Sequence, residues 1–155
     1  MAAWIREDQA LILRRSWAVT GGVEALIRAT SMPMLPELHP LIVSVQERSD
    51  GDFEIRELLP LGPLRLPNRY RGRQSVSEDR RTIRLAAHAP GGVHLLHTLQ
   101  LSPEGERVQV EHEVRVEAPW LLRDYVARTA EAAHDGWVER VKGWVEAEKA
   151  PDQPS

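Results

Sequence analysis

The chain of 155 residues contains no cysteine, which excludes disulfide frameworks, thiolate metal sites and cysteine nucleophiles together. It also lacks an excess of one charge: 20 basic residues stand against 23 acidic ones, so bulk attraction to nucleic acid or to an anionic membrane is not indicated. No apolar run approaches the roughly 18 residues of a membrane span, and Arg6, Glu7 and Asp8 stand where a secretory signal would be apolar. We therefore expect a cytoplasmic protein with no nucleic-acid partner and no integral membrane association.

Short segments that alternate apolar and polar residues fill most of the chain before residue 117. Such alternation predicts β-strands, and the short spacers between the later ones predict antiparallel neighbours. Asp50-Gly51 is a strong hairpin signal. The seven expected strands are residues 10–19, 41–48, 53–59, 68–76, 81–89, 93–101 and 107–116.

Three other segments separate these strands. Thr20 is a suitable N-cap for a short helix over residues 23–29. Residues 30–40 hold three prolines among methionines and leucines, which predicts an irregular or one-turn piece that we interpret as a lid. Residues 60–67 are also rich in proline, and we expect a loop packed on the body.

The last long segment, residues 120–147, has no proline, and its apolar residues recur at steps of three and four. This spacing predicts one helix of roughly 40 Å, which needs a large apolar surface to lie on. Its middle carries small side chains and its ends large ones. The small ones are Thr129, Ala130, Ala132, Ala133 and Gly136, and the large ones are Leu122, Tyr125, Trp137 and Trp144. A slim middle indicates a space between helix and sheet.

The order of elements is one strand, two short helical pieces, about six antiparallel strands and a long helix. This order, with patches at residues 16–19, 23–26 and 124–144, resembles the START-like superfamily, also called the helix-grip or SRPBCC fold, in its polyketide cyclase/dehydrase and lipid-transport branch. The resemblance implies an α+β fold, in which a curved antiparallel sheet of about seven strands wraps a C-terminal helix and an apolar ligand fills the gap. The expected boundaries are a flexible lead-in at 1–9, one domain at 10–148 and a disordered tail at 149–155.

Two histidines stand on otherwise apolar strand faces, His97 in residues 93–101 and His112 in residues 107–116. If the turn leaves Ser102 opposite Arg107, His97 faces His112 directly on the helix side, with Cβ atoms roughly 4.5–5.5 Å apart. A slip of one residue would send one histidine to the other face. The pair could orient a ligand or move a proton near neutral pH; the alternative is two satisfied core histidines without a ligand.

A metal site is disfavoured, because zinc requires three or four ligands and Glu57 is the one further inward candidate. We predict no metal and no cofactor. Arg15 and Glu57 lie on apolar strand faces, where they either meet in a polar cavity or reach solvent at strand ends. Gln74 is a further possible lining residue. Arg69, Arg71 and Arg73 alternate along one strand, which predicts a solvated face with acidic cross-strand partners rather than a phosphate site.

The function that we expect is the binding of a small apolar or amphipathic molecule by a monomer or homodimer. The expected ligand-binding residues are Trp17, Tyr70, His97, His112, Tyr125, Thr129, Ala133 and Trp137. A first alternative is an enzyme of polyketide cyclase or dehydratase type, in which His97 or His112 abstracts a proton and Tyr70 or Arg15 steadies the enolate. A second is a protein-interaction module that uses residues 58–66 as its surface and has a filled core.

Overall fold

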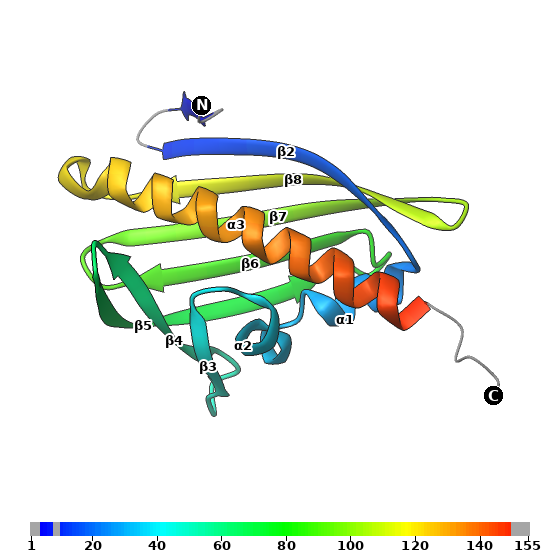
Figure 1. Cartoon of the computed structure of the whole chain (residues 1–155), viewed down its shortest axis with the longest axis horizontal. Helices are drawn as coiled ribbons and strands as arrows, with labels where there is room; N and C mark the ends of the chain where they lie inside the picture. The colour runs from blue at the N-terminus through cyan, green and yellow to red at the C-terminus, as the bar shows by residue number, and fades with distance from the viewer. Residues whose placement is uncertain (1–3, 8–9, 150–155) are drawn as a thin grey trace.

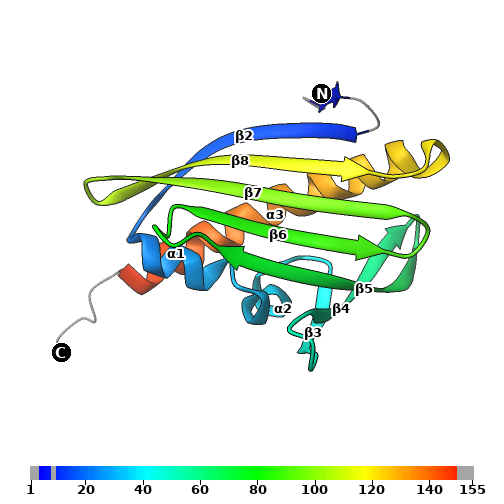
Figure 2. The ribbon, with the colours of Figure 1, turned by 180° about the vertical axis from the view of Figure 1, so that it is seen from behind.

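The computed structural model describes residues 4–7 and 10–149. Eight antiparallel strands form one sheet in the order β1-β2-β8-β7-β6-β5-β4-β3, and α3 crosses one face of it diagonally (Figure 1). Seen from behind, the strands lie in front of α3, which stays on the opposite face (Figure 2). The elements are β1 (Trp4–Glu7), β2 (Ala10–Thr20), α1 (Val23–Ala29), the 3₁₀ turn η1 (Met32–Met34), α2 (Leu35–Leu38), β3 (Ile42–Glu47), β4 (Phe53–Leu61), β5 (Leu64–Val76), β6 (Thr82–Ala89), β7 (Val93–Glu104), β8 (Arg107–Glu117) and α3 (Trp120–Lys149).

The predicted architecture, a curved antiparallel sheet around a long C-terminal helix with two short helical pieces after the first long strand, is confirmed. The sheet also gains a strand, because Trp4–Glu7 within the expected lead-in pairs with β2. Residues 1–3, 8–9 and 150–155 of the expected lead-in and tail lie outside the described residues.

The loop predicted at residues 60–67 is wrong, because these residues form the β4–β5 hairpin. Leu61 pairs with Leu64, Pro60 with Arg65 and Leu58 with Pro67. Proline is tolerated because β6 pairs with β5 only from Arg71 onward, so the first half of β5 has an open side where no N–H is needed.

The predicted Thr20 cap is also wrong. Thr20 still pairs with Arg107 in the sheet, and the N-cap of α1 is Gly22, which makes no side-chain capping bond. The strand therefore continues one residue further than the alternation indicated, and the helix depends on packing rather than on a cap.

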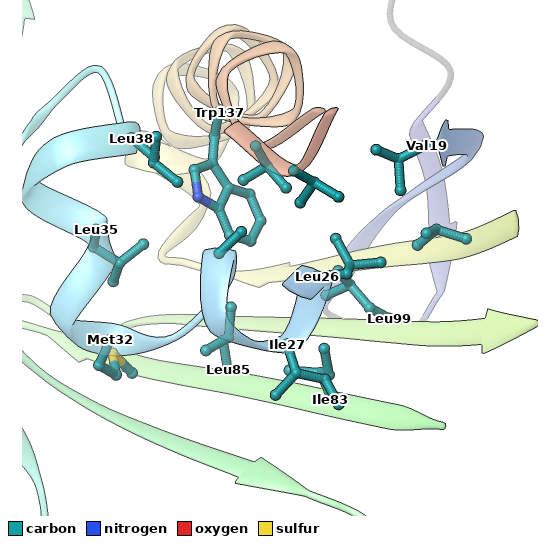
Figure 3. Close-up of a cluster of buried hydrophobic side chains, with 14 of the residues drawn as sticks. Val19, Leu26, Ile27, Met32, Leu35, Leu38, Ile83, Leu85, Leu99 and Trp137 are labelled. Carbon is teal, nitrogen blue, oxygen red and sulfur yellow. The ribbon is translucent and has the colours of Figure 1, made fainter. Parts of the chain in front are cut away.

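The carboxy-terminal half of α3 lies on the main hydrophobic core (Figure 3). Leu26 and Ile27 of α1, Ile83 of β6 and Leu99 of β7 belong to this core together with Val141 of α3. Each is at most 7 % exposed, so this core is filled.

The Gly21→Ala substitution is expected to lower the free energy of unfolding by about 2–4 kcal/mol. Backbone strain and overpacking each contribute about half of this loss. Gly21 has φ +150°, and an added Cβ would lie 2.5 Å from Cγ1 of Val145. Urea unfolding measures the change. Gly22→Ala is the matched control, since its Cβ would meet nothing within 4 Å, and it should cost less than about 1 kcal/mol. Equal losses in both variants would contradict the close approach of β2 to α3.

Candidate functional site

A cavity of about 270 Å³ lies between the amino-terminal half of α3, strands β4 to β7 and the η1–α2 segment. Its walls are mostly apolar, and the small residues Thr129, Ala130 and Ala133 lie in the middle of its helix side. These small residues leave the space that larger side chains fill further along the helix. The cavity therefore lies where the slim middle of the predicted helix indicated a gap.

The cavity lining contains most of the expected ligand-binding residues. Those that line it are Tyr70, His97, Tyr125, Thr129, Ala133 and Trp137. Trp17 and His112 are outside the lining and contact each other, with Trp17 Nε1 3.4 Å from His112 Nδ1. His112 thus lies one layer behind His97.

The register predicted between β7 and β8 is wrong by two residues. His97 pairs with Val114, and His112 pairs with Leu99, because β7 runs on to Glu104 and the turn is Gly105-Glu106. An even shift keeps both histidines on the same face. They are diagonal neighbours instead of direct ones, and His97 Nδ1 still lies 3.1 Å from His112 Nε2.

A third histidine, which the sequence interpretation missed, completes the cluster. His134 of α3 is 3 % exposed, and its Nε2 lies 2.9 Å from His112 Nδ1. Its Nδ1 lies 3.3 Å from Oδ1 of Asp135. The signal was present, because His134 follows Ala130 by four residues and precedes Trp137 by three, which places it on the buried helix face.

Burial keeps these rings neutral. It lowers the pKa of His97 to about 3 and that of His39, which also lines the cavity, to about 4. Burial also holds the pKa of His112 well below its ordinary value. The pKa of His134 is lowered by burial too, against the opposing effect of its hydrogen bond to Asp135.

Glu57 and Arg15 do not meet. Glu57 lines the cavity, where it accepts hydrogen bonds from Asn68 Nδ2 at 2.9 Å and from the Tyr70 hydroxyl at 3.4 Å; burial raises the pKa of Glu57 and, more strongly, that of Tyr70. Arg15 instead pairs with Glu131 of α3 at 2.6 Å. The wall of the cavity formed by β4 and β5 therefore carries the carboxyl group of Glu57.

The proline-rich segment at residues 30–40 forms a wall of the cavity. Met32 and Leu35 line it and are 2 % and 6 % exposed. Gln74 is not part of the lining; its Oε1 accepts the backbone N–H of Met32 at 2.9 Å and fixes this wall to β5. The segment is thus anchored core, where the sequence favoured a lid.

One buried donor in the cavity has no acceptor. Trp137 is 2 % exposed, and its Nε1 has no hydrogen-bond partner among the described residues. In Figure 3 its indole hangs from α3 toward the sheet, with the nitrogen on the side of Leu35 and Leu38. A buried donor without an acceptor costs about 1–3 kcal/mol, so a group that accepts from it here gains affinity.

Three features of the described residues bear on other classes of site. They contain no group of three or more histidine, aspartate or glutamate residues placed to hold a metal ion. None of the helices within residues 10–149 is long and apolar enough to cross a membrane. The prediction of a solvated arginine face is confirmed, since the side chains pair with acidic ones. The pairs are Arg69–Glu54, Arg71–Asp50 and Arg73–Asp52.

The fold recurs in solved structures of low sequence identity. A conserved protein from Geobacillus kaustophilus superposes with a TM-score of 0.73 at 11 % identity, over 87 % of this chain and 95 % of its own. The Zhui aromatase/cyclase from Streptomyces sp. R1128 gives 0.71 at 15 % identity, over 90 % and 95 %. A START superfamily protein from Mycobacterium smegmatis gives 0.68 at 12 % identity, over 88 % and 98 %. No family model and no curated protein sequence matches the chain.

Proposed function

We propose that this chain, which has the helix-grip fold of the START-like superfamily, binds a small apolar or amphipathic molecule in the cavity beneath α3. The observation that carries the proposal is the donor of Trp137, buried without an acceptor in the wall of an apolar cavity of about 270 Å³. A cavity of about 150 Å³ suffices to bind benzene. The volume therefore suits a molecule of about two fused rings.

The polar groups define where a ligand's polar end lies. The rings of His97 and Trp137 are 5.8 Å apart at their centroids and meet edge to face. A ligand carbonyl can accept from Trp137 Nε1 while the apolar body lies along Ala130 and Ala133. Burial of about 200 Å² of apolar ligand surface contributes about 5 kcal/mol, and the hydrogen bond fixes orientation.

We infer that the mouth of the cavity lies between the start of α3 and the β4–β5 hairpin, because Leu122 of α3 and Leu59 of β4 both line the cavity. The Tyr125 hydroxyl donates to the Pro60 carbonyl at 2.8 Å and joins the two elements. Exposed apolar side chains surround this junction. They are Leu61, Leu64, Leu66, Trp120, Leu121 and Leu122. We assign these side chains to ligand entry. The alternative, a protein-interaction module, was expected to have a filled core, and the core of this protein contains a cavity.

The Trp137→Phe substitution is expected to weaken binding of an apolar ketone more than binding of the matching hydrocarbon. The change removes the donor and part of the indole, and both ligands respond alike to the lost ring area, so affinity for 2-tetralone should fall about 2- to 10-fold more than affinity for tetralin, the contribution of one neutral hydrogen bond. Isothermal titration calorimetry with 2-tetralone and with tetralin measures both. Trp144→Phe is the control, because Trp144 belongs to the same helix and lies outside the cavity lining. Equal affinity for the ketone in Trp137→Phe and the unsubstituted protein would refute the assigned donor.

A further inference from the structure

An unbroken line of ring nitrogens runs from the cavity to the surface. His97 lines the cavity, and its Nδ1 lies 3.1 Å from His112 Nε2. His112 Nδ1 lies 2.9 Å from His134 Nε2, and His134 Nδ1 lies 3.3 Å from Asp135. The Asp135 side chain is 60 % exposed. The line thus begins at a buried cavity wall and ends in solvent.

A proton can enter or leave the line at either end. Of the two ring nitrogens of His97, only Nδ1 has a hydrogen-bond partner among the described residues, so Nε2 is available to a ligand in the cavity. His112 and His134 are hydrogen-bonded through both of their ring nitrogens. A neutral imidazole donates from one nitrogen and accepts at the other. A ring held between two partners can therefore take a proton on one side and release one on the other.

The surroundings support two proton arrangements of this line. Trp17 Nε1 can only donate, and it faces His112 Nδ1 at 3.4 Å, which favours a proton on Nε2 of every ring. The Asp135 carboxylate can only accept, which favours a proton on Nδ1 of His134 and, through the shared bonds, on Nδ1 of every ring. Neither arrangement requires a cationic ring.

We propose that His97, His112 and His134 conduct one proton between a ligand in the cavity and Asp135, so that the protein catalyses proton removal beside the carbonyl of a small apolar ketone. This inference rests on the proposed binding function. His97 is the catalytic residue, since it lines the cavity beside Trp137 with its Nε2 available to a ligand. His134 also lines the cavity, but both of its ring nitrogens are bonded, to His112 and Asp135. His112 and His134 therefore act through His97.

The proton balance closes without a further reactant. His97 Nε2 takes a proton from the α-carbon, and the electron pair of the broken C–H bond moves to the carbonyl oxygen, which Trp137 Nε1 steadies. His97 Nδ1 passes its proton to His112 Nε2, and His112 Nδ1 passes one to His134 Nε2. His134 Nδ1 then gives its proton to Asp135, which releases it to solvent. Each ring gains one proton and loses one, and the reverse sequence returns a solvent proton to the α-carbon.

The relay also explains how so buried a histidine can act as a base. Burial holds the pKa of His97 near 3, so an isolated ring would be a weak base at neutral pH. Passing a proton onward avoids the buried cation. Two further charged groups, Glu131 and Arg15, face the outer end of the line. Arg15 Nε lies 4.0 Å from Asp135, and Arg15 Nη2 bonds Glu131 at 2.6 Å. His39, which directly follows α2, is the further titratable ring that faces His97.

The first test needs no ligand. Nitrogen-15 NMR of histidine-labelled protein reports the tautomer of each ring. Asp135→Ala should shift all three relay rings toward Nε2–H, and Trp17→Phe should shift all three toward Nδ1–H, with about 2- to 10-fold changes in the tautomer ratio. His39 is the internal control, because its Nδ1 accepts the N–H of Leu41 outside the line. A change confined to His134 in Asp135→Ala would overturn the relay.

The second test measures the proton transfer itself. In D₂O the protein should accelerate α-deuteration of 2-tetralone, and His97→Gln should reduce the rate about 100-fold without loss of ketone affinity. His94→Gln is the control, since His94 lies on the outward face of the same strand. Ketone that binds without faster exchange would overturn the catalytic claim and leave the binding function intact. If calorimetry detects no binding of the ketone, the binding function is refuted for ketones. The nitrogen-15 NMR tautomer shifts then decide whether the three histidines are coupled as a relay.

Discussion

The Ala133→Phe substitution is expected to abolish ligand binding while the protein remains folded. Ala133 is 7 % exposed and forms part of the cavity wall, so a phenyl group at this position projects into the space that the ligand needs. Affinity for 2-tetralone should fall at least about 100-fold, since a ring in the cavity removes the apolar burial that drives binding.

The stability of the Ala133→Phe variant shows whether the new side chain fills the cavity or disrupts the fold. A side chain that enters an existing cavity meets little resistance, so the free energy of unfolding should stay within about 1 kcal/mol or increase. Ala132→Phe is the matched control, because Ala132 is the adjacent, exposed residue of the same helix turn. Full affinity in Ala133→Phe would place the ligand elsewhere, and equal loss in both variants would point to a general disturbance of α3.

Acid is expected to destabilise the protein from about pH 6.5 downward. In the folded protein the pKa of His97 is about 3 and that of His39 about 4, against about 6.5 in an unfolded chain. Between these values the unfolded state binds more protons, so stability is complete above pH 6.5 and is lost as the pH falls. Each group contributes about 1.4 kcal/mol per pH unit at most.

The expected loss by pH 4.5 is about 3–5 kcal/mol, because both rings face the cavity and retain some access to water. This approaches the whole stability of many small domains. Glu57 opposes the trend near the acid end, since a raised carboxyl pKa favours the folded state as that group is protonated. Urea unfolding at several pH values measures the slope.

The double variant His39→Gln/His97→Gln should reduce the pH dependence of stability without removing it, because burial also lowers the pKa of His112 and His134. His88→Gln/His94→Gln, at exposed positions of β6 and β7, should leave the pH dependence unchanged. A free energy of unfolding that is constant between pH 7 and pH 4.5 would contradict the burial of neutral histidines.

The order of strands and helices could be predicted because their patterns are local. Alternation placed β2 and β8, and the run without proline placed α3, each within a few residues. Pairing across the sheet is a non-local property. The sequence interpretation ended β7 before Pro103, whereas the strand continues to Glu104, so the predicted register was wrong by two residues. The prolines of the β4–β5 hairpin misled for the same reason, because the open side of β5 depends on where β6 ends.

The candidate site was only partly predictable. The small residues of α3 indicated the cavity, and face assignment brought His97 and His112 together despite the wrong register. His134 was missed because it belongs to a different element, and its contact with His112 depends on how α3 crosses the sheet. Helix crossing is set by packing of side chains that sequence periodicity does not resolve.

Native mass spectrometry of the protein purified gently from its host, followed by extraction of any released molecule, tests most directly whether the cavity holds a ligand. If the cavity binds a ligand, a reproducible small apolar adduct is expected on the unsubstituted protein and is absent from Ala133→Phe. A mass equal to the bare chain in both, unchanged after incubation with 2-tetralone, quinones and lipids, would contradict it.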